Sequence, residues 1–168
     1  MKTALTTPIS DDVIRELKVG DIVSISGLIY AGRDAVLPKL VSLAERGLAE
    51  DNGINLRGGV IFHSAVSRAG VGPTSSNKPE IESSIGPLSA HGVKLHLGKG
   101  ALSPETVRQL WEHNAVYAVI PPVTALLKLK TEMCEAAAFP EEGMEALHRL
   151  RVTDYPAIIA AAHGESLY

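Results

Sequence analysis

The stretch SPETVRQLWEHNAVYAVI, residues 103–120, joins a helix pattern directly to a strand pattern. Ser103 is a favourable N-cap, and Pro104 follows at the first helical position, where a missing N–H group costs little. The run 115–120 is apolar throughout, which is typical of a central strand that is covered on both faces. The helix is expected to pack through an apolar stripe of Val107, Leu110 and Trp111. A helix that leads into a buried strand favours an α/β fold.

Similar patterns continue on both sides of this stretch. Short β-branched runs predict strands at 21–27, 58–64, 93–98, 147–152 and 156–162. Capping residues and helical spacing predict helices at 10–17, 34–46 and 121–130. Glycine and proline place connecting loops at 49–59 and 136–143. Strands that alternate with helices are typical of an α/β or mixed three-layer domain.

Length and composition limit the functional classes. The 168 residues fit one domain, residues 1–168, which is large enough to bury a substantial core. The formal net charge of −3 lacks the basic excess of a nucleic-acid binder. There is no signal-peptide pattern, and no window reaches the roughly 18 apolar residues of a membrane span. A single cysteine, Cys134, fits a reducing compartment, so we expect a cytoplasmic protein without nucleic-acid or membrane partners.

Common nucleotide and metal motifs do not occur in the sequence. The segment GVKLHLGKG (92–100) lacks P-loop spacing, because five residues instead of four precede the Gly-Lys pair and glycine stands where a hydroxyl residue belongs. The six histidines show no metal-ligand spacing, so we expect no metal site. His63 and His163 follow predicted strands, where ligands of α/β sheets gather, although a structural histidine is the commoner interpretation of each.

Three glycine-bearing loops follow predicted strands, and each carries a cation. They are YAGRD with Arg33, GPTSSNK with Thr74 and Lys78, and LGKG with Lys99. Glycine lets the backbone approach a ligand closely, and consecutive N–H groups form a concave site for anions. If the strand ends converge, these loops make a small-anion site. The alternative is that they are solvated turns with incidental basic residues.

The order of six segments along the chain resembles a known family. The segments are GDIVSISGLIYAGRDA, IFHSA, GPTSSNK, VKLHLGKGALS, AVYAVIPP and GMEALHRLRVTDYPAIIAAAHGESLY. Together they are similar to the β subunit, or C-terminal domain, of the iron-sulfur dependent class I hydro-lyases, fumarase and L-tartrate dehydratase. The resemblance covers nearly the whole chain. It implies a three-layer β/β/α swivelling domain with a mixed sheet, which adds water to or removes it from a small dicarboxylate.

The resemblance also implies roles for individual residues. Thr74 matches the threonine that serves as the catalytic base toward the carbon-bound proton. The expected substrate-binding residues are Arg33, Gly72, Ser75, Lys78 and Lys99. The chain departs from the usual family pattern at Leu37, Ser75, Lys78 and Pro79, where the family has histidine, threonine, arginine and methionine. Lysine is a compact point charge where arginine offers a planar pair of donors.

The same resemblance implies a partner and a cofactor. Family members dock on an α subunit that carries a four-iron four-sulfur cluster, so we expect a hetero-oligomer. About three cysteine thiolates are needed to hold such a cluster. One cysteine is too few, so the cluster is expected on the partner. The sequence leaves the substrate open among malate and fumarate, tartrate, and mesaconate. The second hypothesis for the chain is a non-catalytic anion-binding or regulatory module with the same fold.

Overall fold

The structure is a computed structural model that describes residues 2–33, 35–67, 70–74, 78–120, 127 and 130–167. For residues 2, 65–67, 70–74, 78–81, 133 and 143–145 it describes the backbone alone. The described strands are β1 (Lys2–Thr6), β2 (Ile22–Ala31), β3 (Val60–Phe62), β4 (Ser64–Ser67), β5 (Gly70–Thr74), β6 (Leu95–Gly98), β7 (Val116–Val119), β8 (Thr131–Ala138), β9 (Leu147–Ala162) and β10 (Glu165–Ser166). The described α-helices are α1 (Asp11–Glu16), α2 (Leu37–Glu45), α3 (Lys78–Ala90) and α4 (Pro104–Glu112), and short 3₁₀ helices cover Glu50–Asn52 and Pro140–Glu145.

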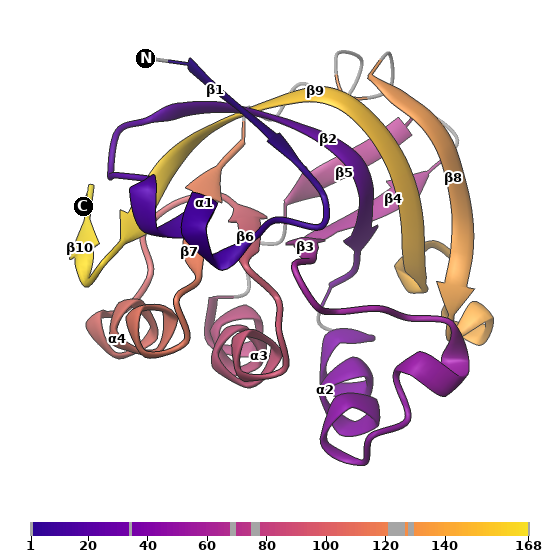
Figure 1. The fold of residues 1–168 in the computed structure, drawn as a ribbon. Coiled ribbons are helices and arrows are strands. Elements are labelled where there is room, and N and C mark those ends of the chain that lie inside the picture. Colours follow the sequence, from indigo (N-terminus) through magenta and orange to yellow (C-terminus); the bar gives the residue numbers. More distant parts are fainter. Residues whose placement is uncertain are drawn as a thin grey trace.

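Most of these strands belong to one mixed sheet that closes on itself. β1, β2, β3, β6 and β7 are parallel neighbours in that order. β9 runs antiparallel to β7 at one end and to β2 along most of its length. Because β9 joins both sides of the parallel set, the strands form two facing layers. Figure 1 shows β2 and β9 arching over β3, β6 and β7.

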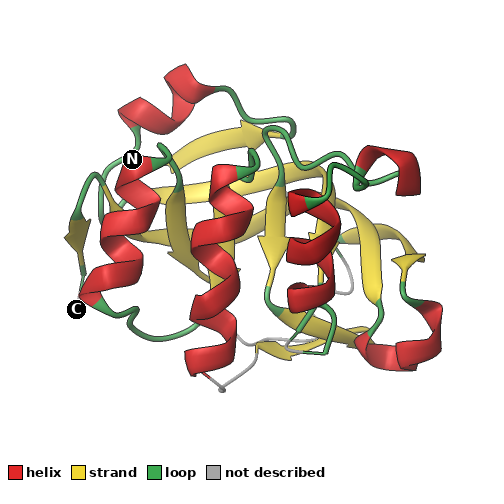
Figure 2. Cartoon of the chain, turned by 90° about the horizontal axis from the view of Figure 1, so that it is seen from below, coloured by secondary structure: helices red, strands yellow, loops and turns green. Residues whose placement is uncertain are grey.

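Three helices form the third layer. α2, α3 and α4 lie side by side on the outer face of the β3, β6 and β7 layer (Figure 1, Figure 2). α4 begins as the sequence predicts, since Ser103 Oγ accepts a hydrogen bond of 3.3 Å from Thr106 N. Trp111 departs from the prediction, because it is 60% exposed and lies over Gly164 instead of in the core. The order of layers is β/β/α, as expected for the α/β class.

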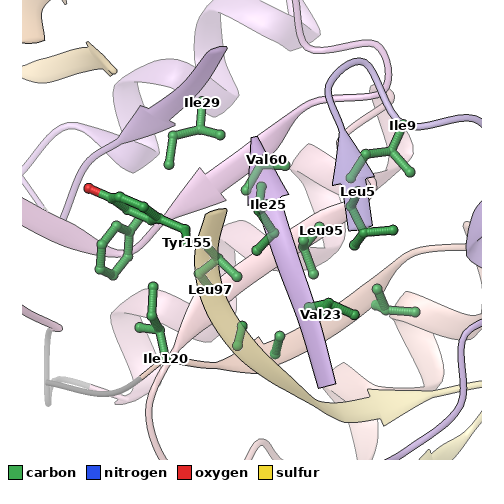
Figure 3. Packing of buried hydrophobic residues seen from close by; sticks show 14 of the residues in the cluster. Leu5, Ile9, Val23, Ile25, Ile29, Val60, Leu95, Leu97, Ile120 and Tyr155 are labelled. Atoms are coloured by element: carbon green, nitrogen blue, oxygen red, sulfur yellow. The ribbon is translucent and has the colours of Figure 1, made fainter. Parts of the chain in front are cut away.

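The main core lies between the two layers of strands. Figure 3 shows apolar side chains from β1, β2, β3, β6 and β9 filling this space. Tyr155 is fully buried there, with its ring edge-on to Phe62 at a centroid distance of 6.3 Å. Two smaller apolar clusters pack α2, α3 and α4 against the sheet. Since apolar burial supplies most of the folding free energy, this layered core holds the strand ends in fixed positions.

Several predicted elements differ from those observed. The strands expected at 147–152 and 156–162 are one continuous strand, β9, because its pairing with β2 continues past Asp154, whose φ is 52°. Residues 70–82 are not a single loop, since β5 ends at Thr74 and α3 begins at Lys78. The helices expected at 10–17 and 34–46 are confirmed as α1 and α2. The helix predicted at 121–130 falls almost entirely outside the described residues.

Gly58 supports a close backbone contact that should not tolerate a side chain. It has a φ of 70°, and an added Cβ would lie 2.9 Å from Ile9 N and 2.7 Å from Pro8 Cβ. We expect Gly58→Ala to lower the free energy of unfolding by about 2 to 4 kcal/mol, because strain and a backbone clash add together. Urea denaturation measures this change. Gly47 has the same φ of 70° but open space around it, so Gly47→Ala should cost only about 1 kcal/mol. Equal losses in the two variants would contradict the clash.

Candidate anion site at the strand ends

The carboxyl ends of three parallel strands bring basic residues to one edge of the sheet. The register pairs Ala31 with Phe62 and Phe62 with Leu97, so β2, β3 and β6 end at the same level. Arg33 lies two residues after the end of β2, and Lys99 directly follows β6. Ligands of open α/β sheets bind at this edge. Two of the cations that the sequence singles out therefore follow strands that end at the same edge of the sheet.

The turn that carries Arg33 is held by its own backbone. Gly32 N donates to Phe62 O at 2.9 Å, and the carbonyl of Arg33 accepts from Val36 N and Leu37 N at 3.1 and 3.0 Å. A Cβ on Gly32 would lie 2.9 Å from Val36 Cγ2, so glycine is required at this close approach. Leu37 is fully buried in the cluster under α2. Leu37, where the resemblance leads us to expect histidine, is therefore part of the apolar core in this chain.

The turn that carries Lys99 is fixed by a buried tyrosine. Tyr117 Oη donates to Gly100 O at 3.2 Å, and a Cβ on Gly98 would lie 3.0 Å from that Oη atom. Gly100 has a φ of 75°, which favours glycine. Tyr117 is 2% exposed, whereas Lys99 is exposed. Lys99 is therefore an exposed residue on a turn that a hydrogen bond from Tyr117 holds.

The remaining predicted site residues are placed through the backbone alone or lie outside the described residues. Gly72 lies in β5, and Thr74 ends that strand, where its Cα pairs with that of Ser64. Lys78 is the first residue of α3. Ser75 is not among the described residues. Because Ser64 follows β3 by two residues, the backbone places Thr74 beside the same edge as Arg33 and Lys99.

A buried pair of histidines lies directly beneath this edge. His63 Nε2 is 3.2 Å from His96 Nδ1, and His96 Nε2 is 2.9 Å from Ser89 Oγ on α3. Both rings are almost completely buried. Burial lowers the pKa of His63 to about 3, and burial together with repulsion from His63 in its protonated form lowers the pKa of His96 well below its usual value. Both rings are therefore neutral at pH 7.

The sequence identified one member of this pair. The pattern predicts His63 at a strand end but does not single out His96, because only the register of β3 and β6 reveals that the two rings meet. His163, the other histidine at a strand end, has its Nε2 atom 2.6 Å from Leu17 O. That contact supports the structural interpretation of His163.

A hollow of about 580 Å³ opens near the start of α1, with Asp11, Arg57, Lys94 and His113 among its lining residues. The cation most deeply set in it, Lys94, is 2.6 Å from Asp11 Oδ1 and also donates to His113 O at 3.1 Å. The neighbouring lysine also lowers the pKa of Asp11. The charge of Lys94 is therefore largely neutralised by Asp11, which disfavours anion binding in this hollow.

Metal ligands do not gather among the described residues. No group of three or more His, Cys, Asp or Glu side chains occurs within that part of the chain. Cys134 lies on β8 with an exposed thiol, and burial of part of its side chain together with Glu135 raises its pKa. A raised pKa disfavours the thiolate form that binds metals. Among the described helices, none is both long and apolar enough to cross a bilayer.

Comparison with known proteins identifies the family of the chain. The fumarase C-terminus family model matches residues 1–168. A protein of Geobacillus stearothermophilus that bears the name of a class I fumarate hydratase is 33% identical over 98% of this chain, which spans 33% of that protein. The L(+)-tartrate dehydratase subunit beta of Escherichia coli K12 is 32% identical, with 99% of this chain and 87% of the relative covered. The anaerobic class I fumarate hydratase of E. coli K12 is 27% identical over 95% of this chain and 30% of its own length. The chain therefore belongs to the fumarase C-terminus family.

Proposed function

We propose that this chain is the β subunit of a class I hydro-lyase that reversibly hydrates a small dicarboxylate of the fumarate and malate type. The observation that supports the proposal is the common level at which β2 and β6 end on either side of β3, with Arg33 and Lys99 next along the chain, in a member of this family. The likeness to the tartrate dehydratase subunit beta covers almost the full chain, which supports a separate subunit. The single cysteine fits a reducing compartment, which supports the cytoplasm as its location.

The chain would supply the proton-transfer group and the carboxylate contacts. Arg33 and Lys99 would each hold a carboxylate of the substrate through charge-assisted hydrogen bonds. Thr74 would remove the carbon-bound proton during dehydration and return it during hydration. A threonine hydroxyl is a weak base, and nearby cations make its alkoxide form more accessible. Gly72, Ser75 and Lys78, on the same segment, would complete the anion site.

The four-iron four-sulfur cluster does not fit this chain as its own cofactor. Such clusters are bound by several cysteine thiolates, whereas this chain has one cysteine with a raised pKa. We therefore place the cluster on an α subunit, and the tartrate dehydratase name supports the existence of a second subunit. The substrate site would be complete only in the complex of both subunits.

The purified chain is expected to fold but to bind no stoichiometric iron and to show no hydratase activity. Its extensive core explains the folding, and its single cysteine explains the lack of iron. Circular dichroism, iron analysis and fumarate hydration test these statements in the chain alone and after co-expression with an α subunit. Activity of the pure chain would refute the division of labour between subunits. An inactive but iron-loaded complex would instead favour the non-catalytic anion-binding module.

A further inference from the structure

The histidine pair beneath the site ends in a nitrogen atom without a partner. His63 Nδ1 is buried, and no hydrogen-bond partner for it exists within the described part of the protein. His63 directly follows β3. The register of the neighbouring strands places it between Gly32, which follows β2, and Gly98, which ends β6. Its other nitrogen faces His96. Since buried N–H and N groups are nearly always paired in folded proteins, this atom points to a partner that binding supplies.

The hydrogen bonds of the pair allow only two arrangements of protons. Both rings are neutral, so each carries one N–H group. If Ser89 donates to His96 Nε2, then His96 Nδ1–H donates to His63 Nε2, and His63 carries its proton on Nδ1. If both rings are protonated on Nε2, every bond reverses, and His63 Nδ1 presents a lone pair.

The contacts of Ser89 favour the first arrangement. In the second, Ser89 Oγ accepts from His96, and its own proton finds no acceptor among the described residues. In the first arrangement, the donors are Ser89 Oγ–H, His96 Nδ1–H and His63 Nδ1–H, and they all point in the direction from α3 toward the strand ends. An anion at that edge also selects the arrangement that offers an N–H group, because a lone pair would repel it. Bonds aligned in this way strengthen one another.

We propose that His63 is a further binding residue of the anion site, donating a hydrogen bond from Nδ1–H to a carboxylate of the substrate, with His96 and Ser89 as positioning residues that hold it in this tautomer. The identity of the ligand as a small dicarboxylate rests on the proposed function. The contact requires no charge on the ring. It adds a neutral donor between the two cationic turns that carry Arg33 and Lys99.

Two substitutions of His63 test the contributions of its two ring nitrogens separately. The amide nitrogen of asparagine can occupy the place of Nδ1, whereas the glutamine amide reaches the place of Nε2 and retains the contact with His96. In the complex with the α subunit, His63→Gln should weaken binding of the unreactive dicarboxylate succinate about tenfold or more, which corresponds to about 1.4 kcal/mol. His63→Asn should recover part of this loss. Calorimetry measures binding without turnover, and His91→Gln, at an exposed histidine after α3, is the control.

The outcomes decide the two proposals separately. Succinate affinity that is unchanged in His63→Gln would overturn the role of His63 even if the complex hydrates fumarate. A complex that binds succinate but hydrates no dicarboxylate would refute the hydro-lyase function, while the affinities of the variants would still decide the role of His63. If the wild-type complex binds none of succinate, fumarate or tartrate, both proposals are wrong.

The tautomers provide an independent test on the full chain. Nitrogen NMR of ¹⁵N-histidine-labelled protein should show both His63 and His96 protonated on Nδ1 and not on Nε2. Ser89→Ala removes the donor that fixes this arrangement, so the Nε2–H form should gain population in both rings. Two rings protonated on Nε2 in the wild type, or tautomers that are unaffected by Ser89→Ala, would overturn the positioning role.

Discussion

Replacement of Thr74 by valine is expected to lower kcat of the complex by about 10² to 10⁴, the usual range for loss of a general base. Valine has nearly the same shape as threonine and is well suited to a strand, so the end of β5 should keep its backbone conformation. The lost hydroxyl group is the proposed proton acceptor. Steady-state kinetics of fumarate hydration, together with exchange of the substrate's carbon-bound hydrogen in D₂O, measures the effect.

A second threonine supplies the matched control. Thr6 is an exposed residue at the end of β1, and it pairs with Ser26 in a part of β2 away from the site. Thr6→Val makes the same chemical change there and should leave kcat unchanged. A Thr74→Val complex with kcat within about twofold of the wild type would show that the hydroxyl is not the base. Loss of exchange with retained succinate binding would place the defect in proton transfer.

The fold was predictable where local signals and packing agree. α4 has a capping serine, a proline in its first turn and buried apolar residues, and the sequence predicts it within two residues. β9 was predicted as two strands because Asp154 and Pro156 are typical of turns. In the structure β2 pairs with β9 on both sides of this point, and that long-range pairing is not encoded in the local pattern. The sequence pattern also does not predict α3, because Pro87 lies in the interior of this helix and proline usually breaks helices.

The candidate site was predictable to the extent that it depends on strand ends. Arg33 and Lys99 follow apolar strands, and parallel strands place such residues at one edge. The contact of His63 with His96 was not predictable, since 33 residues separate them and a register shift of one would turn one ring to the opposite face. Ser89 joins them through helix packing, which gives no sequence signal.

The same histidine pair should make the chain unstable in mild acid. In the unfolded chain both imidazoles titrate near pH 6.5. In the folded chain burial lowers the pKa of His63 to about 3 and that of His96 well below its usual value. Below pH 6.5 the unfolded state therefore binds more protons than the folded state. The stabilising contribution is complete above pH 6.5 and is lost as the pH falls toward the folded-state values.

We expect His63 alone to reduce the free energy of unfolding by about 1.4 kcal/mol per pH unit between about pH 5.5 and 3.5, with His96 acting in the same direction. Urea denaturation at a series of pH values measures the slope. Carboxylates add a background in this range, so the comparison is with His96→Leu, which removes one titrating ring and should flatten the curve. His91→Gln, which replaces an exposed histidine, should not flatten it. Parallel curves for the wild type and His96→Leu would mean that His96 takes up its proton at the same pH in the folded and unfolded chains, which would contradict the burial of a neutral ring at this position.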